Sequence, residues 1–237
     1  MNEIIKILAK LDGGTVLDAA SGRGEFINTL KQHLKSYAQI IGVDSSERSV
    51  DYAQKLFPEN DIEIFRMNLE QLQFADNYFD MVCISNSLHH LENIDAVLKQ
   101  LIRVLKPGGY FLMTEMYSDG TQSPAQETHI IMHHWLSSAD RLCGTYHRNT
   151  YTKSELEEIA AALPLKNMQI VDFYVPVDNA KINCETLVRN CKETIKRLEN
   201  ITDSESLVAE GHLVLQRLAE IGCASASRLL ITAIKPA

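Results

Sequence analysis

The sequence predicts a doubly wound α/β domain, in which helices cover both faces of a mostly parallel sheet. Three observations carry this prediction. Short apolar runs alternate with helical patterns, a glycine-rich turn joins the first run to a helix, and 237 residues suffice for one domain with a sizeable core. The predicted strands are residues 15–19, 39–44, 62–67, 79–85, 110–115, 168–175 and 227–233.

Apolar residues at helical spacing predict the helices that precede and follow the first strands. Residues 1–11 form an amphipathic helix without the unbroken apolar run of a signal peptide. A second helix follows the glycine-rich turn over residues 26–34, and Ser45 or Ser46 is expected to cap a third that ends at Leu56. These elements complete a βαβ unit.

The fifth strand is expected to follow a helix over residues 94–105. Lys106, Pro107, Gly108 and Gly109 should end that helix, because proline cannot continue it and glycine allows the chain to reverse.

Two segments fall outside the alternating pattern, and both are assigned to a single domain over residues 1–237. Residues 117–151 form a candidate lid, with a loop near Ser123 and Pro124 and a helix over residues 129–142. Residues 178–223 carry two apolar helical faces, which predict an antiparallel helix hairpin inserted between strands six and seven. This insertion either closes a pocket or forms a homodimer interface.

The composition limits the classes of partner that the protein is expected to bind. A formal net charge of −8 argues against sequence-independent binding of nucleic acid, which requires lysine and arginine to displace counterions. No run of about 18 apolar residues predicts a membrane span. Five cysteines without a C-x-x-C pair are typical of a reducing compartment. We therefore expect a cytoplasmic protein with a small-molecule partner.

The glycine-rich turn after the first strand predicts a cofactor site. Gly22 and Gly24 lack Cβ atoms where a ligand must approach the backbone, and the following helix directs its N-terminus at an anion. Asp44, at the end of the second strand, is placed to accept hydrogen bonds from ribose hydroxyls. A dinucleotide fingerprint would need glycine where Ile27 stands, and no phosphate-binding G-x-x-x-x-G-K-[ST] loop occurs.

Over roughly residues 15–116, the sequence resembles the class I S-adenosylmethionine-dependent methyltransferases, in particular the group similar to ubiquinone and menaquinone biosynthesis methyltransferases. The family motif D-x-G-x-G-x-G corresponds to Asp18–Gly24, where Ala20 replaces the first glycine by adding one methyl group. Residues 79–91 resemble its fourth-strand motif, and Leu105–Gly109 its turn before strand five.

The resemblance implies a Rossmann-like seven-stranded sheet, mostly parallel with an antiparallel last strand, and S-adenosylmethionine as the cofactor. It assigns the ribose to Asp44 and the flanks of the adenine to Asn68 and Leu69, with Ser85 nearest the cofactor on strand four. The cofactor-binding residues expected from motif and resemblance together are Asp18, Ala20, Gly22, Gly24, Asp44, Ser45, Asn68, Leu69 and Ser85.

The expected reaction is an in-line displacement that transfers the methyl group to a small-molecule acceptor, for which the enzyme mainly aligns the acceptor and excludes water. A base is needed only if the acceptor must lose a proton, and His90 is the best placed imidazole. A histidine at a helix end, bonded to backbone, is the structural alternative. The [DN]-P-P-[YFW] signature of enzymes that methylate nucleic-acid amino groups is absent after strand four.

Candidates for the acceptor pocket are Glu115, Tyr117, His129, His133 and Arg148. For Glu115, a satisfied buried carboxylate is the alternative. His129 and His133 share a helix face, which suits substrate contact, a metal ligand pair or a solvated face. No established metal spacing is matched, and no metal is predicted.

Cys184 and Cys191 are seven residues apart on a predicted helix, about 10 Å along its axis, and are too far apart for a disulfide. We assign them to core packing.

Two other functions fit parts of the pattern. A protein that binds S-adenosylmethionine or its demethylated product without turnover would share the cofactor site. A nicotinamide-dependent oxidoreductase would share the glycine-rich turn, but Ile27 disfavours it.

Overall fold

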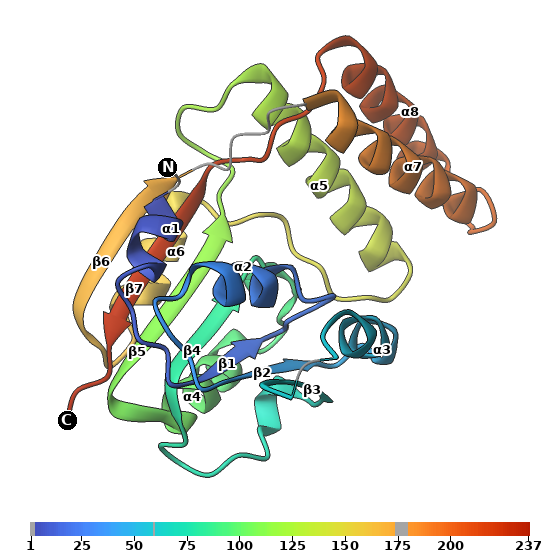
Figure 1. The fold of residues 1–237 in the computed structure, drawn as a ribbon. Helices are drawn as coiled ribbons and strands as arrows, with labels where there is room; N and C mark the ends of the chain where they lie inside the picture. Colours follow the sequence, from blue (N-terminus) through green and yellow to red (C-terminus); the bar gives the residue numbers. More distant parts are fainter. Residues whose placement is uncertain (1–2, 59, 174–179) are drawn as a thin grey trace. The chain divides into compact units, whose positions relative to one another are not determined.

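The computed structural model describes residues 3–58, 60–173 and 180–237, which divide into two compact units (Figure 1). The sheet unit comprises the described part of residues 1–115 with residues 157–173 and 229–237. The helical unit comprises residues 116–156 and the described part of 174–228. The candidate lid and the inserted hairpin therefore belong to the same compact unit.

The sheet unit contains a seven-stranded sheet in the order β3-β2-β1-β4-β5-β7-β6. Strands β1 to β5 pair in parallel, and β7 runs opposite to β5 and β6 (Figure 1). This confirms the prediction of a mostly parallel, Rossmann-like sheet with an antiparallel last strand. The strands are β1 Thr15–Ala19, β2 Gln39–Asp44, β3 Ile62–Arg66, β4 Phe79–Ser85, β5 Leu105–Met116, β6 Lys166–Phe173 and β7 Arg228–Ile234.

The helices begin and end close to the predicted positions. Ser46 caps α3, because its hydroxyl accepts a hydrogen bond from the amide of Ser49 at 3.3 Å. The helices are α1 Glu3–Leu8, α2 Glu25–His33, α3 Glu47–Leu56, α4 Ile94–Val104, α5 Pro124–Leu142, α6 Lys153–Ala161, α7 Ala180–Leu198 and α8 Glu205–Glu220, with short 3₁₀ helices η1 Leu69–Gln71 and η2 Leu88–His90.

The central strands are buried on both faces. Val16 and Leu17 are neighbours on β1, so their side chains point to opposite faces, yet both are fully buried. Val82 and Cys83, neighbours on β4, are equally inaccessible. Burial on both faces explains why these strands read as continuous apolar runs rather than as alternating patterns.

The predicted start of the fifth strand is wrong. β5 begins at Leu105 rather than Tyr110, because α4 ends at Val104 and the chain enters the sheet at once beside Phe79. The pairing shifts between Phe79 and Met81, which places the Lys106–Gly109 turn inside the strand as an irregularity. A Cβ on Gly109 would lie 2.8 Å from the carbonyl oxygen of Asp80, so the close strand approach requires glycine there.

Two further predictions need correction at their boundaries. Ser123 and Pro124 do not lie in a loop: Ser123 caps α5 in a capping box with Gln126, and Pro124 is the first helical residue, where its missing N–H costs nothing. Strand β6 covers Lys166–Phe173, two residues earlier than expected at its start. The predicted end of this strand, at residues 174–175, lies outside the described residues.

The assignment of Cys184 to core packing alone is also wrong, whereas Cys191 is a buried free cysteine as expected. Cys184 and Cys223 form a disulfide across a sequence separation of 39 residues. The spacing along one helix correctly excluded a disulfide between Cys184 and Cys191. It gives no information about Cys223, which is distant in sequence and is brought close by the fold of the helix hairpin.

The helical unit packs α5, α7 and α8 around the single tryptophan of the chain, Trp135. Its indole N–H donates to the carbonyl of Leu207 at 2.8 Å, and the ring lies against α8 at Gly211. A Cβ on Gly211 would lie 2.5 Å from the Trp135 ring and 2.7 Å from Ile195. In the described residues, no helix combines the length and apolar character needed to cross a bilayer.

The substitution Gly211→Ala tests whether helix propensity or packing against Trp135 has the larger effect on the free energy of unfolding. Propensity alone would stabilise the protein by about 1 kcal/mol, since glycine in a helix interior is unfavourable. We expect instead a loss of about 1–3 kcal/mol in the free energy of unfolding, because Trp135 and Ile195 must move. Denaturant unfolding measures the change, with His212→Ala at the neighbouring exposed position as the control. A stabilised Gly211→Ala protein would contradict the packing described here.

Candidate functional site

The candidate site lies at the carboxyl ends of the central parallel strands of the sheet unit. The pairing places Ala19, the last residue of β1, beside Val43 on β2 and Ile84 on β4. Asp44 and Ser85, which end β2 and β4, therefore reach the same edge as the glycine-rich turn. In open α/β sheets this edge, next to a reversal of strand order, is where ligands bind.

Asp44 is fixed by the backbone on both sides of it. Its Oδ2 accepts a hydrogen bond from the amide of Gly22 at 2.8 Å, and its Oδ1 accepts one from the amide of Ser46 at 2.8 Å. The first contact ties β2 to the glycine-rich turn, and the second ties it to the start of α3. A carboxylate oxygen can accept two hydrogen bonds, so each oxygen retains capacity for a ligand hydroxyl.

The turn after β1 passes through the left-handed region three times. Ala20, Gly22 and Gly24 have φ angles of 54°, 54° and 90°. For Ala20 this conformation costs about 1–2 kcal/mol, since its Cβ crowds the carbonyl oxygen. The replacement of the family's first glycine is therefore a larger departure than the single methyl group suggested.

Gly22 and Gly24 are required for different reasons. A Cβ on Gly24 would lie 2.3 Å from the ring of Phe57, so this glycine permits packing. A Cβ on Gly22 would meet nothing closer than a Glu25 carboxylate oxygen at 3.8 Å. Gly22 therefore faces open space at the strand edge.

Asp18 is the unusual residue of the site. Its side chain is 1% exposed, and within the described residues neither carboxylate oxygen has a hydrogen-bond partner. Burial, followed by the negative charges of Asp44 and Glu25, raises the pKa of Asp18 well above its ordinary value. A buried carboxyl without partners is costly, and a ligand that brings a donor or a positive charge would remove that cost.

Asn68 and Leu69 lie just after β3. The Asn68 Oδ1 accepts a hydrogen bond from the amide of Glu70 at 2.9 Å, which caps η1, and Leu69 is buried. The amide of Met67 donates to the carbonyl of Asp44 at 2.9 Å, so the start of this segment is held beside the end of β2.

Ser85 contacts Thr114 on the neighbouring strand, with 2.9 Å between the hydroxyl oxygens. The glycine-rich turn is reached by Ser87 instead, whose hydroxyl donates to the carbonyl oxygen of Ser85 at 2.9 Å and lies 3.4 Å from that of Ala20. Sequence reasoning missed Ser87, which follows the fourth strand by only two residues.

A buried histidine–glutamate pair joins the ends of β4 and β5. Glu115 accepts a hydrogen bond from the amide of Leu88 at 2.8 Å, and its other oxygen lies 3.0 Å from Nδ1 of His89. Both side chains are almost completely buried, with 2% and 1% exposure for His89 and Glu115. His90 is exposed, and its ring centroid lies 4.2 Å from that of His89.

The sequence contains both histidines but does not reveal which one is buried. Successive residues of a 3₁₀ turn point about 120° apart, so adjacent histidines face different surroundings. The prediction selected His90 and missed His89.

Within the helical unit, three acceptor-pocket candidates take part in internal contacts. The backbone amide of Tyr117 donates to Ser227 at 3.1 Å, and Nδ1 of His129 accepts from the amide of Ala226 at 3.2 Å. Arg148 lies 3.1 Å from Glu155, and its guanidinium lies 3.6 Å from the centroid of the Tyr151 ring. The contacts of Arg148 hold the segment after α5, whereas those of Tyr117 and His129 hold the segment that leads into β7.

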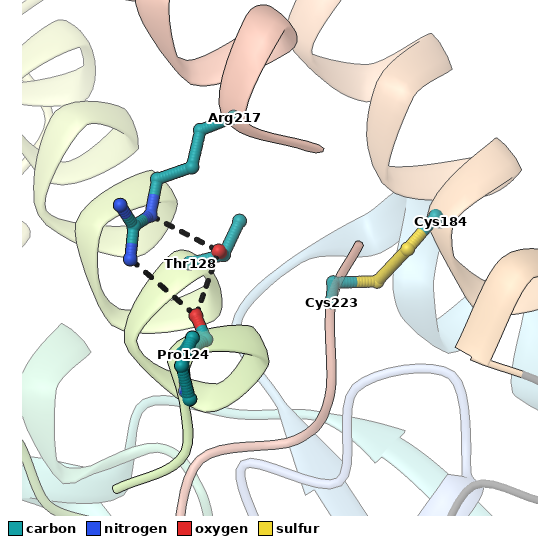
Figure 2. The surroundings of a disulfide bond; sticks show 5 residues. All are labelled: Pro124, Thr128, Cys184, Arg217 and Cys223. Atoms are coloured by element: carbon teal, nitrogen blue, oxygen red, sulfur yellow. Dashed lines mark hydrogen bonds between the residues drawn. A yellow bond between two sulfur atoms is a disulfide. The ribbon is translucent and has the colours of Figure 1, made fainter. Parts of the chain in front are cut away.

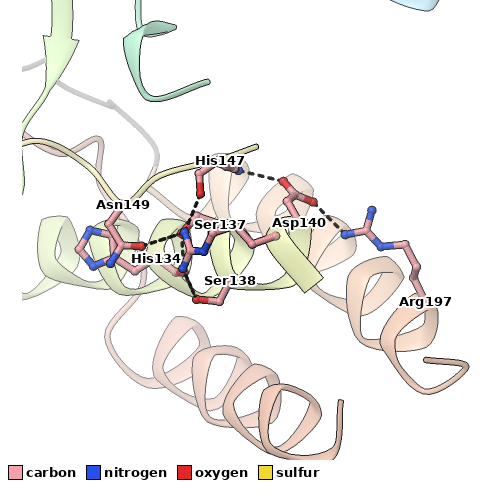
Figure 3. A network of polar contacts seen from close by, with 8 residues as sticks. His134, Ser137, Ser138, Asp140, His147, Asn149 and Arg197 are labelled. Atoms are coloured by element: carbon pink, nitrogen blue, oxygen red, sulfur yellow. Dashed lines mark hydrogen bonds and ion pairs between the residues drawn. The ribbon is translucent and has the colours of Figure 1, made fainter. Parts of the chain in front are cut away.

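The fourth candidate of this unit is His133, whose ring packs edge-on against that of His147, with 4.9 Å between the ring centroids. Figure 3 shows the polar network around His147 and Asp140. His147 is buried, and its Nδ1 lies 2.9 Å from Asp140, which also pairs with Arg197 of α7 at 3.0 Å. Burial raises the pKa of Asp140, but hydrogen bonds from His147 and Arg197 outweigh it, and the pKa lies below its ordinary value.

Comparison with known proteins agrees with this geometry. Residues 17–113 match the methyltransferase domain family. The ubiquinone/menaquinone biosynthesis C-methyltransferase UbiE of Haemophilus ducreyi is 37% identical over 107 residues, which are 44% of this chain and 41% of that protein. The chain thus spans less than half the length of this curated relative.

Solved structures show the same fold over nearly the whole chain. The YcgJ protein of Bacillus subtilis superposes with a TM-score of 0.62 at 19% identity, covering 99% of this chain and 97% of that one. A phosphoethanolamine N-methyltransferase of Haemonchus contortus, solved with S-adenosylhomocysteine, gives a TM-score of 0.59 at 20% identity and covers 99% and 52% of the two chains. Residues 17–113 thus match a methyltransferase domain, and part of the chain is similar to the ubiquinone/menaquinone C-methyltransferases.

Proposed function

We propose that this protein transfers a methyl group from S-adenosylmethionine to a small-molecule acceptor. The observation that carries the proposal is the buried carboxyl of Asp18, which has no partner in the described residues and lies below the open glycine-rich turn. The matched domain, residues 17–113, contains this site. A relative over part of the chain is named as a C-methyltransferase of quinone biosynthesis.

The residues present fit the proposed cofactor. Asp44, held by two amides, would accept hydrogen bonds from the ribose hydroxyls. Asp18 would face the ammonium of the amino-acid portion, because a positive charge there stabilises its ionised form. Asn68 and Leu69 would flank the adenine. Ala20, Gly22, Gly24, Ser45 and Ser85 complete the proposed cofactor-binding set.

When bound, the cofactor supplies a methyl carbon already activated by a sulfonium. The chain then has to align the acceptor, exclude water and, where needed, remove a proton. We propose His90 for the proton, because it is exposed at the end of β4 and imidazole titrates near neutral pH. Glu115, Tyr117, His129, His133 and Arg148 are proposed to shape the acceptor pocket, either directly or by holding the segments that line it.

The surroundings proposed for the protein follow from its composition. A net charge of −8 disfavours nucleic acid as the acceptor. The proposed location is the cytoplasm, where the reducing environment would keep Cys184 and Cys223 partly as thiols. The inserted hairpin, α7 and α8, offers a surface for a homodimer.

The two glycines of the turn provide a matched test of the cofactor site. Gly22→Ala places a methyl group in open space, so we expect the free energy of unfolding to fall by about 1–2 kcal/mol, the cost of the left-handed backbone alone. Its affinity for S-adenosylhomocysteine should fall about tenfold or more, because the methyl group occupies ligand space. Gly24→Ala should lose about 2–3 kcal/mol of stability against Phe57.

Calorimetric titration and denaturant unfolding separate these effects. Wild-type affinity for S-adenosylhomocysteine in Gly22→Ala would remove the turn from the cofactor site.

Labelled methyl transfer tests the reaction itself. The full chain is incubated with S-adenosylmethionine labelled in the methyl group and a panel of metabolites that includes aromatic ring carbons, hydroxyls, amines and thiols. We expect transfer to at least one acceptor. His90→Ala should lower the turnover number about 10²-fold or more while leaving the affinity for S-adenosylhomocysteine unchanged.

Saturable cofactor binding with no transfer to any acceptor would support a binding protein instead. Full activity of His90→Ala across the pH range would exclude this histidine as the base.

A further inference from the structure

The helical unit contains a disulfide that joins the open end of the inserted hairpin. Cys184 lies in the second turn of α7, and Cys223 follows the end of α8 (Figure 2). Their Cα atoms are 5.9 Å apart, and the side chains are buried, with 8% and 2% exposure. The bond closes a loop of the chain that contains both helices.

The Cys223 end of this bond is held independently of the disulfide. The amide of Ala224 donates to the carbonyl of Ala125 at 3.0 Å, and that of Ala226 donates to His129 at 3.2 Å. Residues 224–227 are thus bound to the first turns of α5 by hydrogen bonds that do not involve sulfur.

The end of α8 is also held to α5. The guanidinium of Arg217 donates to the hydroxyl of Thr128 at 3.1 Å and to the carbonyl of Pro124 at 3.5 Å (Figure 2). It also pairs with Glu127 at 3.3 Å. Breaking the disulfide would leave these contacts in place.

Residues 184–190 of α7 depend on the disulfide more than the Cys223 segment and the end of α8 do. Among the described side chains of this helix, Cys184 is the first that is buried, and the next is Cys191, two turns later. Between them, only Leu187 and Val188 pack partly against the core of the helical unit. Ile195 and Leu198 hold the far end of α7 in that core. Cys184 is therefore the one buried side chain of residues 184–190, and the disulfide is the principal contact that holds this segment to the helical unit.

We propose that Cys184 and Cys223 form a reversible redox site that exchanges with low-molecular-weight disulfides and controls the order of residues 184–190 of α7. Both states can keep the fold, since α8 and the far end of α7 are held by other contacts. The inference does not depend on the methyl transfer proposed above.

The exchange balances with glutathione disulfide as the oxidant. One cysteine thiolate attacks glutathione disulfide, forming a mixed disulfide and expelling one glutathione thiolate. The second cysteine thiolate attacks the cysteine sulfur of the mixed disulfide and expels the other glutathione. Two cysteine thiols are oxidised, one glutathione disulfide is reduced to two glutathione thiols, and the protons of the cysteines pass to the products.

The other three cysteines do not compete for this reaction. Burial raises the pKa of Cys191 to about 11 and that of Cys83 well above its ordinary value, so little thiolate forms at neutral pH. Cys143 is exposed, and it remains a single free thiol in the described chain. It could take one glutathione but has no neighbouring cysteine with which to complete a disulfide.

Mass spectrometry of the full chain tests the site. The protein is equilibrated with graded ratios of reduced and oxidised glutathione, quenched with an alkylating reagent in denaturant and digested. We expect Cys184 and Cys223 to lose alkylation together as the ratio becomes oxidising and to regain it together on return. Alkylation at every ratio, or a disulfide that no ratio reduces in the folded protein, would overturn the proposal.

Hydrogen exchange of the same samples tests the structural consequence. Reduction should speed amide exchange about tenfold or more in residues 184–190, because local opening of these turns becomes easier. Residues 205–220 should exchange at an unchanged rate. Equal exchange of residues 184–190 in both states would overturn the proposed control of α7.

Serine variants provide the controls. Cys184→Ser and Cys223→Ser should show the fast exchange of the reduced protein at every glutathione ratio. Cys143→Ser should retain the redox response, because this exposed cysteine is outside the pair. If the serine variants do not fold, the reduced wild-type protein still decides the outcome.

Discussion

The proposed site depends on a carboxyl group that the fold buries without a partner. Asp18 lies beside Gly42 and Cys83 because β1 is an interior strand, flanked by β2 and β4. Apolar neighbours cannot supply donors, so the carboxyl remains unsatisfied and its pKa rises. The glycine-rich turn follows Asp18 directly, and the amide of Gly22 in this turn also fixes Asp44.

The residues of the site carry local strain. Ala20 adopts a left-handed conformation, and Asp18 is buried without hydrogen bonds. Such costs persist only where the surrounding structure enforces them, and they are frequent at ligand-binding sites. A cofactor with hydroxyls for Asp44 and an ammonium for Asp18 would remove part of this cost.

Much of the sheet could be predicted because its central strands are buried on both faces. Thr15–Ala19, Gln39–Asp44 and Phe79–Ser85 have the predicted bounds, since a continuous apolar run between turn residues has few other solutions. The start of β5 could not be predicted, because Pro107 and Gly108 indicate a turn equally well inside a strand irregularity and after a helix.

Contacts between residues that are far apart in the sequence could not be predicted from local patterns. The disulfide partner of Cys184 lies 39 residues away, and it is brought close only by the packing of α7 against α8. His89, rather than His90, is buried against Glu115, which belongs to β5 and is distant in the sequence. For Asp18, the motif indicated the position, but the missing hydrogen-bond partners became evident only in the folded chain.

The sequence and structural comparisons divide the chain in an informative way. The sequence match ends at residue 113, whereas the structural likeness extends over 99% of the chain at 19% identity. Residues that carry the proposed cofactor chemistry lie inside the matched segment. The helical unit lies beyond it and has its own buried network around Asp140 and its own disulfide. We propose that acceptor choice resides in the helical unit, which lies outside the segment matched by the methyltransferase domain family.

Proton release on cofactor binding tests the role of Asp18 most directly. Because burial raises the pKa of Asp18, the unliganded protein holds this proton at pH values between the ordinary 3.8 and the raised value. An ammonium brought by S-adenosylhomocysteine would lower the pKa again, so binding should release a proton and tighten as pH rises through this window. Calorimetric titration in two buffers of different ionisation enthalpy should show release of about one proton by the wild type and none by Asp18→Asn. Identical binding enthalpies for the wild type in both buffers would contradict the account.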